Sequence, residues 1–560
     1  MVHLGIERIG GDSMQGSSIP AGVRGVHTGA ALKSVGRGAS GDMGAAFKRG
    51  VRDLGFLDPR SLAFFRIMLG ALLVLDAALR LIDLRAFYTD FGVLPRTVVI
   101  EKHNPVAHFS FLMSSGAAWF QAVVLLFAAA SGISLAAGYR TRLSAVVSWV
   151  LLVSIQYRNP LILQGGDVLF RIMVLFAAIL PVGAVWAVDA RCRIAGQLRP
   201  SLLHFAYVAQ VACVYIVTGA AKCKYPEWRN GFGLPYALWL QQYTTWLGDL
   251  VGVLPLSVLR VMNAGVLAAE ILLPLLLVVP WRVPTMRAVC FAVMVSFHIA
   301  ILLTLKVGLF SLISIIAWLP LLPTRFWQVL SSKLKSPAVR QLLEVEGPPE
   351  SCATTRLRRR WKEGVGLLLL AFLLVWNGSN ISASLRGSFR PEWLRQTALF
   401  FGIDQSWEMF SRSISSDGWF IIPAVRADGS MIDLFSGEEY SGPQRPESIS
   451  AAFPGDRWRK YWRNLLGSDR NYQRLGLGRY LCRRSMEDPD PKRHIQALQI
   501  VFIQEPIKAD GSHGAPEKIL LWNHECKTGL SKKWEKRLPF SALPLPKGSL
   551  GGQTQAAPQR

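Results

Sequence analysis

The sequence predicts an α-helical polytopic membrane bundle of about eight or nine spans, followed by a mainly β extramembrane domain. Of the 560 residues, 51% are hydrophobic and only 18% are charged, whereas a soluble domain carries about 25% charged residues. The mean hydropathy is +0.29. The charges lie in short segments between apolar runs, and most runs are near the ~20 residues that a helix needs to cross a bilayer.

Four regions are predicted along the chain. Residues 1–50 are rich in Gly, Ser, Ala and Arg, which is typical of a disordered tail, and they lack the apolar core of a secretory signal. Residues 55–385 contain the apolar runs. Residues 386–540 are expected to form the β-rich extramembrane domain. Residues 541–560 are rich in Pro, Gly, Gln and Ser and predict a disordered end.

The apolar runs give the predicted spans 61–81, 117–137, 143–163, 168–188, 202–221, 259–280, 283–305, 307–323 and 364–383. The run 307–323 is short and is expected to be tilted or partly re-entrant. The stretch 232–255 is amphipathic and rich in Trp and Tyr, which favours the membrane interface. With nine spans and the N-terminus inside, Lys and Arg concentrate in the inside segments. This places the C-terminal domain in the periplasm of a bacterium or the lumen of a eukaryote.

The C-terminal region combines strand-like segments with one helix. Strands are predicted from β-branched and aromatic content, at 419–425, 431–435, 494–504 and 518–525. Asp428-Gly429 predicts a hairpin turn between the first two strands. The Arg- and Trp-rich segment 456–466 predicts a helix.

Several function classes are disfavoured by composition and motifs. The net charge of +25 comes from basic residues in loops between apolar runs, not from a basic face interleaved with aromatics, so nucleic acid is not an expected partner. The seven cysteines include no CxxC pair, and no metal site is expected. Cys482 and Cys526 fall in the C-terminal domain and could pair if that domain is periplasmic. Phosphate-loop, GxSxG and HExxH motifs are absent from the sequence.

Ionisable residues inside predicted spans need partners on other helices or contact with water. They are Arg66, Asp76, Arg171, Glu270 and His298. Two interpretations remain open for them: polar contacts that hold the bundle together, or the lining of a polar cavity. A lone His such as His298 is more often a hydrogen-bonded core residue than a catalyst, and no second His lies at zinc-ligand spacing on its helix.

Lys222 lies at the end of the fifth predicted span, in TGAAKCKYPEWRNG (218–231). A Lys in a partly dry pocket beside another cation, here Lys224, can act as a general base. The simpler interpretation is a Lys that reaches the lipid boundary from an apolar helix.

Four segments in order resemble the HTTM (horizontally transferred transmembrane) domain, which is related to the membrane domain of vitamin K-dependent gamma-carboxylase. They are DPRSLAFFRIMLGALLVLDAALRLIDLRAFYTDFGVLPR (58–96), YRNPLILQGGDVLFRIMVLFAAILPVGAVW (157–186), YIVTGAAKCKYPEWRNG (215–231) and FHIAILLTLKVGLFSLISIIAWLPLLP (297–323). The tail segment 401–437 is similar to the extramembrane region that follows this domain in bacterial relatives. The resemblance therefore implies a bacterial inner membrane protein.

The resemblance also implies a chemistry. In the carboxylases, a Lys in the fifth-span motif deprotonates vitamin K hydroquinone, and this role falls on Lys222, with Lys224 as a rival because the spacing is one residue longer. His298 is implied to face the same cavity. Arg66, Arg171, Trp228 and Lys224 are candidate binding residues by position. A quinone or vitamin K-like hydroquinone is the implied cofactor, with carboxylase-like lyase or monooxygenase chemistry if the protein is catalytic.

One departure separates the chain from the carboxylases. Asn159 stands where a catalytic His is expected after the third span, so Asn159 is only a weak catalytic candidate. Two functions therefore remain open. The first is a quinone-linked or lipid-substrate redox enzyme with its site on the periplasmic side, which predicts an apolar pocket beside Lys222. The second is a non-catalytic membrane scaffold or export/immunity-type factor that binds a periplasmic protein partner, with the exposed helix at Trp458 and Trp462 as the contact site. A transporter is disfavoured because no inverted repeat is evident.

Overall fold

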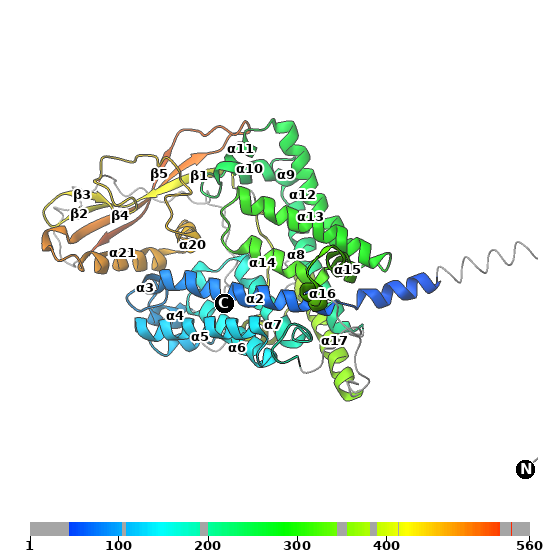
Figure 1. Cartoon of the computed structure of the whole chain (residues 1–560). Coiled ribbons are helices and arrows are strands. Elements are labelled where there is room, and N and C mark those ends of the chain that lie inside the picture. Colours follow the sequence, from blue (N-terminus) through cyan, green and yellow to red (C-terminus); the bar gives the residue numbers. More distant parts are fainter. Residues whose placement is uncertain are drawn as a thin grey trace, which may run out of the picture. The chain divides into compact units, whose positions relative to one another are not determined.

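The structure, a computed structural model, describes residues 44–102, 108–190, 200–343, 356–380, 389–412, 414–526 and 539. The predicted N-terminal tail lies outside these ranges apart from residues 44–50, which are helical, and the predicted end 541–560 lies outside them entirely. Residues 1–49 and 50–560 form two separate units. The architecture below is that of the second unit (Figure 1).

Six helices in the described ranges are long and apolar enough to cross a membrane. The first candidate, Gly44–Ile82, contains α2 (Pro59–Ile82); the others are α5 (Ala118–Ala137), α8 (Leu202–Cys223), α12 (Leu256–Leu276), α13 (Val283–Thr304) and the part Arg360–Ser379 of α17 (Arg356–Ser379). A seventh would result if Phe310–Leu321 and Thr324–Lys333, which meet at 92°, form one bent span. The chain is thus an integral membrane protein by its helices.

The predicted count of about eight or nine spans is too high, because three apolar runs form shorter or more polar helices. Run 143–163 forms α6 (Thr141–Arg158), which begins and ends with arginine-containing turns. Run 168–188 forms α7 (Gly165–Ile179), of only 15 residues. It ends early because Pro181 disfavours the helical conformation at Leu180. Run 307–323 forms α14 (Phe310–Trp318), of 9 residues, followed by η3 (Leu319–Leu321) and α15 (Thr324–Lys333).

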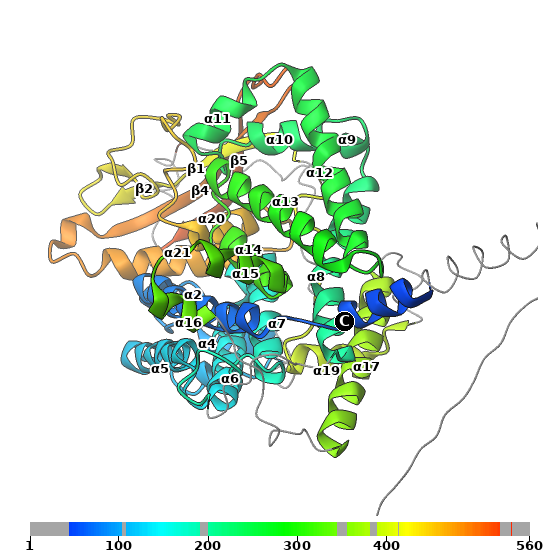
Figure 2. The same ribbon diagram turned by 45° about the vertical axis from the view of Figure 1, so that its right-hand side comes forward.

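Small residues allow the long helices to approach closely. A Cβ atom on Gly70 of α2 would lie 2.5 Å from the carbonyl oxygen of Gly132 in α5, so the two backbones touch, as at other membrane helix interfaces. Helix α8 packs against both α12 and α17. It therefore occupies a central position, as Figure 2 shows, and its side chains meet several other helices.

Short helices connect the long ones. They are α3 (Leu84–Phe87), α4 (Arg96–Lys102), η1 (Phe111–Met113), η2 (Pro160–Ile162), α9 (Pro226–Arg229), α10 (Gly233–Trp239), α11 (Trp246–Gly252), α16 (Pro337–Leu343) and α19 (Glu392–Phe400). Helices α10 and α11 cover the amphipathic stretch 232–255. Trp246 is 78% exposed, which suits a side chain at the membrane interface.

The C-terminal region contains a five-stranded antiparallel sheet built around one long strand. Strand β4 (Ile495–Pro506) pairs on one side with β1 (Ser416–Ile421) and β2 (Pro423–Arg426), which follow each other along it, and on the other side with β5 (Glu517–Glu525). Strand β3 (Met431–Asp433) pairs with β2. The four predicted strand segments are confirmed, although 419–425 divides between β1 and β2. The predicted Asp428-Gly429 turn joins β2 and β3, with Gly429 at φ 91°.

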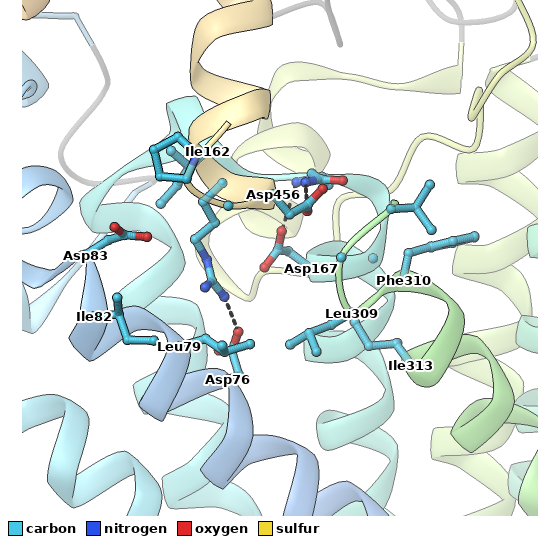
Figure 3. Close-up of a pocket in the computed structure, with 17 residues that line it drawn as sticks. Asp76, Leu79, Ile82, Asp83, Ile162, Asp167, Leu309, Phe310, Ile313 and Asp456 are labelled. Carbon is cyan, nitrogen blue, oxygen red and sulfur yellow. Dashed lines mark hydrogen bonds and ion pairs between the residues drawn. The ribbon is translucent and has the colours of Figure 1, made fainter. Parts of the chain in front are cut away.

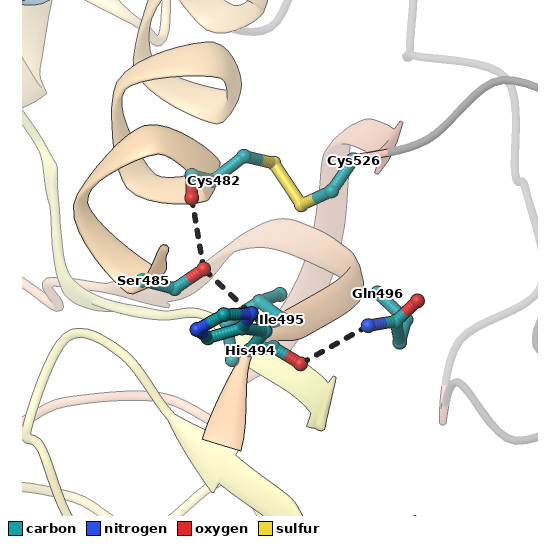
Figure 4. Close-up of a disulfide and its surroundings, with 6 residues drawn as sticks. All are labelled: Cys482, Ser485, His494, Ile495, Gln496 and Cys526. Carbon is teal, nitrogen blue, oxygen red and sulfur yellow. Dashed lines mark hydrogen bonds between the residues drawn. A yellow bond between two sulfur atoms is a disulfide. The ribbon is translucent and has the colours of Figure 1, made fainter. Parts of the chain in front are cut away.

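Two helices, α20 (Asp456–Asn464) and α21 (Asn471–Ser485), lie between the sheet and the helical bundle in both views (Figures 1 and 2), with η4 (Pro491–Arg493) before β4. Helix α20 matches the predicted segment 456–466, whereas α21 was not predicted. A disulfide joins Cys482 of α21 to Cys526 after β5, with their Cα atoms 5.5 Å apart (Figure 4). It fixes α21 on the sheet.

Candidate functional site

One buried face of α8 carries three polar side chains near the end of the helix. Tyr215, Thr218 and Lys222 follow at spacings of three and four residues, which places them on the same side of the helix. All three are at most 5% exposed. Buried polar groups in a membrane bundle need partners from neighbouring helices.

Lys222 forms an ion pair with Glu270 of α12. The distance from Lys222 Nζ to Glu270 Oε1 is 2.5 Å, and both residues are 4% exposed. Gly219 makes the contact possible, because a Cβ at this position would lie 2.7 Å from Cγ1 of Ile271. The predicted cationic neighbour, Lys224, is exposed at the C-cap of α8. The charged group in contact with Lys222 is therefore the Glu270 carboxylate, not a second cation.

Trp228 covers Lys222 from the helix end. Its ring centroid lies 4.5 Å from Lys222 Nζ, a cation–π contact. Asn263 of α12 donates to the Trp228 carbonyl oxygen at 3.0 Å, and the Trp228 indole Nε1 donates to the carbonyl oxygen of Phe410 at 2.8 Å. Trp228 is thus held through both its backbone carbonyl and its indole N–H.

A second group of polar side chains lies about two helical turns deeper, where α8, α13 and α14 meet. The Tyr215 hydroxyl lies 2.7 Å from His298 Nε2 and accepts a hydrogen bond from Trp318 Nε1 at 2.8 Å. On α14, Ser311 and Ser314 share the buried face of Trp318. The rings of Phe297 and Phe310 contact the His298 ring.

This part of the bundle contains buried polar atoms that the protein does not satisfy. Glu270 Oε2, His298 Nδ1 and Ser311 Oγ have no hydrogen-bond partner among the described residues. Such atoms are uncommon in native structures, and each calls for an explanation, such as a bound water, an ion or a catalytic role. The site can therefore offer hydrogen-bond donors and acceptors to a polar group enclosed by aromatic rings.

The structure brings together only some of the residues proposed from the sequence. Lys222 and Trp228 are in contact, with Glu270 as their partner. Ser311, Ser314, Trp318 and Tyr215 were not proposed, although the spacing of Ser311, Ser314 and Trp318 along one face of an apolar run would have indicated a polar contact.

The other proposed residues have contacts elsewhere. Asn159 caps η2, accepting from the Leu161 amide at 3.1 Å and donating to the Phe87 carbonyl at 2.9 Å. Arg66 donates to the Trp186 carbonyl. Arg171 pairs with Asp404 at 2.5 Å. These contacts are of the kind that holds a bundle together. The described residues contain no group of three or more His, Cys, Asp or Glu that could bind a metal ion.

A separate cavity of about 170 Å³ lies where the bundle meets the C-terminal domain (Figure 3). Its polar side is formed by charged residues of α2, α7 and α20, and Asp76 accepts hydrogen bonds from Arg80 at 2.7 Å and Arg457 at 2.5 Å. Its apolar side includes Leu309 and Phe310. The predicted pocket beside Lys222 is not this cavity, since neither Lys222 nor His298 lines it.

The comparisons with known proteins give one match. The family model described as HTTM domain matches residues 56–327, a range that includes every residue of the site except Phe410. No curated protein matches the chain, and no solved structure matches it. The family predicted from the four sequence segments is confirmed, and residues 56–327 of this membrane protein form an HTTM domain.

Proposed function

We propose that the protein is a membrane enzyme that removes a proton from a membrane-soluble acid of hydroquinone type, with Lys222 and Glu270 as the acting pair. The observation that carries the proposal is the group of three unpartnered buried polar atoms, Glu270 Oε2, His298 Nδ1 and Ser311 Oγ. Ionisable residues within a membrane bundle mark functional sites by default. The surrounding Trp, Tyr and Phe rings suit a flat apolar ring with hydroxyl groups.

The ion pair suggests how the proton moves. A protonated Lys cannot accept a proton, but the Glu270 carboxylate can, and its Oε2 atom has no partner. The substrate O–H would transfer its proton to Glu270 Oε2. The Lys222 ammonium, already within 2.5 Å of this carboxylate, would then pair with the new oxyanion on the substrate. A hydroquinone, when bound, supplies two electrons to an acceptor such as oxygen.

We place the site on the side of the membrane that the C-terminal domain occupies, and we propose that this side is the periplasm of a bacterium. The Cys482–Cys526 disulfide favours an oxidising compartment for this domain. The domain contacts the end of α2 through Asp83 and Trp458 and the start of α7 through Gln164 and Asp456. Because Trp228, directly after α8, contacts Phe410, the Lys222 end of α8 belongs to the same side.

The scaffold alternative loses its predicted contact site. Helix α20 was expected to be exposed, but Trp462 is only 5% exposed. The Trp458 indole donates to Asp83 at 2.9 Å and its ring contacts Phe87. The prediction was wrong because Trp458 is covered by the bundle, whereas Trp462 packs against Phe420 and Phe435 of the C-terminal domain itself.

The test is oxidation of reduced menaquinone or a vitamin K analogue by purified protein in nanodiscs supplied with oxygen. Lys222→Ala and Glu270→Gln should each lower turnover at least ~100-fold, as expected for loss of an acid–base group. Lys224→Ala, which alters an exposed Lys two residues away, should stay within about twofold of wild type. Absence of turnover in folded wild-type protein with every quinol, or full turnover in Lys222→Ala, would reject the proposal.

A further inference from the structure

Residues 403–410 form an extended segment that packs against the helical bundle, with Gln405 and Trp407 buried. This stretch, here called the internal segment, has no regular secondary structure. Trp407 is 0% exposed and belongs to the same apolar cluster as the helices of the bundle. The segment contacts α6, α7, α8 and α17, whose side chains form hydrogen bonds with Asp404 and Gln405.

Side chains of the helices satisfy the backbone of the internal segment. Arg171 of α7 donates to the Asp404 carbonyl at 3.0 Å, and Trp376 of α17 donates to the Gln405 carbonyl at 2.7 Å. Irregular backbone is tolerated at membrane depth only where protein or enclosed water satisfies it. The helices therefore supply hydrogen bonds that the backbone of the internal segment cannot form with itself.

The internal segment reaches far below the end of α8. Gln210 of α8 donates to Gln405 Oε1 at 2.9 Å, and Gln210 lies ~20 Å along the helix axis from Cys223 at 1.5 Å per residue. From that depth the chain returns to Phe410, beside Trp228. The segment thus runs along α8 through the region that holds the polar site.

The segment ends at a strained residue. Phe410 has φ 52°, a conformation that is a genuine outlier for a bulky residue and that persists only when the surroundings impose it. In this conformation the Phe410 carbonyl accepts the hydrogen bond from Trp228 Nε1, 2.8 Å away, and the Phe410 ring contacts Tyr243. Backbone strain at the residue whose carbonyl binds Trp228 indicates that the fold fixes the position of this carbonyl.

We propose that the internal segment is a positioning element of the Lys222–Glu270 pair, acting through the hydrogen bond from Trp228 to the Phe410 carbonyl. The catalytic consequence of this inference depends on the proposed function, whereas the geometry does not. The bond fixes the Trp228 ring over Lys222, which limits the ammonium group to the side that faces Glu270. Trp228 and Phe410 are thus positioning residues, and the C-terminal part of the chain completes a site that otherwise lies in the HTTM domain.

The test compares two tryptophans that bind the same segment. Trp228→Phe keeps the ring over Lys222 and removes its N–H, whereas Trp376→Phe removes the equivalent bond to Gln405 without touching Lys222. Acetic anhydride labelling of Lys222 in nanodiscs is read by peptide mass spectrometry, with Lys224 as the internal reference. Trp228→Phe should raise the labelling rate of Lys222 at least about threefold, and Trp376→Phe should leave it within about twofold.

Equal labelling in Trp228→Phe and wild type, or an equal rise in Trp228→Phe and Trp376→Phe, would overturn the proposal. Labelling needs no turnover, so the result stands even if no quinol is oxidised; where turnover is present, kcat should fall in Trp228→Phe alone.

Discussion

Two buried groups of charged side chains differ in how completely their atoms are paired. In the bundle, Lys222 and Glu270 form the membrane pair, and Glu270 Oε2 has no partner among the described residues. At the meeting of bundle and C-terminal domain, Asp76 binds Arg80 and Arg457, and Arg80 also binds Asp167 at 2.8 Å. This second group is here called the junction network, and no buried side-chain atom of its four residues lacks a partner.

The difference supports a structural role for the junction network and the proposed function for the membrane pair. A buried ion pair stabilises a fold only when its remaining hydrogen-bonding capacity is also used, because removing charges from water is costly. The junction network meets that condition and joins α2 and α7 to α20. The membrane pair does not meet it, so part of its hydrogen-bonding capacity remains for a ligand.

The largest expected effect concerns the membrane pair. Glu270→Leu should lower the free energy of unfolding by about 3–5 kcal/mol, because it leaves the Lys222 ammonium buried without its partner. Adding Lys222→Met should restore most of this loss but none of the turnover. Thermal unfolding and quinol oxidation of the two single variants and the double variant measure both quantities. A double variant that stays as unstable as Glu270→Leu would show that the pair is structural.

A smaller effect, confined to stability, is expected in the junction network. Asp76→Asn removes the charge shared by Arg80 and Arg457 and should cost about 2–4 kcal/mol of unfolding free energy, since Arg80 keeps Tyr88 and Asp167 as partners and the Asn side chain still offers one oxygen to Arg457. Turnover per folded molecule should change less than about twofold. Asp83→Asn is the matched control on the same helix, because Asp83 accepts one hydrogen bond, from Trp458. Loss of turnover in folded Asp76→Asn would remove the contrast between the two groups.

Apolar run length predicted the positions of the long helices, because hydrophobic segments near ~20 residues leave few alternatives. It overestimated the spans where a polar helix or an internal proline intervened, as at Pro181. The Lys222–Glu270 contact was beyond sequence reasoning, because it joins helices 48 residues apart and depends on the close approach at Gly219. The internal segment was missed for a related reason: Asp404, Gln405 and Glu408 make it polar, like an ordinary loop.

Lys460 lies on α20, the helix that contributes Arg457 to the junction network. No hydrogen bond or ion pair with another described residue engages its ammonium group, so it offers a contrast with the paired charges of that network. Burial, with Arg463 adding to it, lowers the pKa of Lys460 from 10.5 to about 8. Its pKa in the folded state lies below the unfolded value, so the stability present above pH ~10.5 is lost as the pH falls to about 8. At pH 7 the folded protein therefore holds a partly buried ammonium group that no ion pair with a described residue offsets.

Lys460→Met should raise the free energy of unfolding by about 1–3 kcal/mol at pH 7, because it removes this charge. Thermal unfolding between pH 6.5 and 9.5 measures the gain. The gain should be constant below pH ~8 and shrink above it. A gain that is independent of pH across this range would show that packing of the new side chain, not charge, is responsible.

The smallest effect tests how closely α8 and α12 must approach. The Cβ of Gly219→Ala would lie 2.7 Å from Cγ1 of Ile271 and 3.4 Å from Cβ of Glu270, so α12 must shift, at a cost of about 1–2 kcal/mol. A shift of a few tenths of an ångström also separates Glu270 from Lys222, and turnover should fall about tenfold. Gly265→Ala is the matched control on α12, because no atom lies within 4 Å of its new Cβ, and it should be neutral or stabilise by up to ~1 kcal/mol. If Gly219→Ala lowers stability but not turnover, the spacing of the membrane pair serves packing alone, and the two groups of buried charges differ less than their hydrogen bonds indicate.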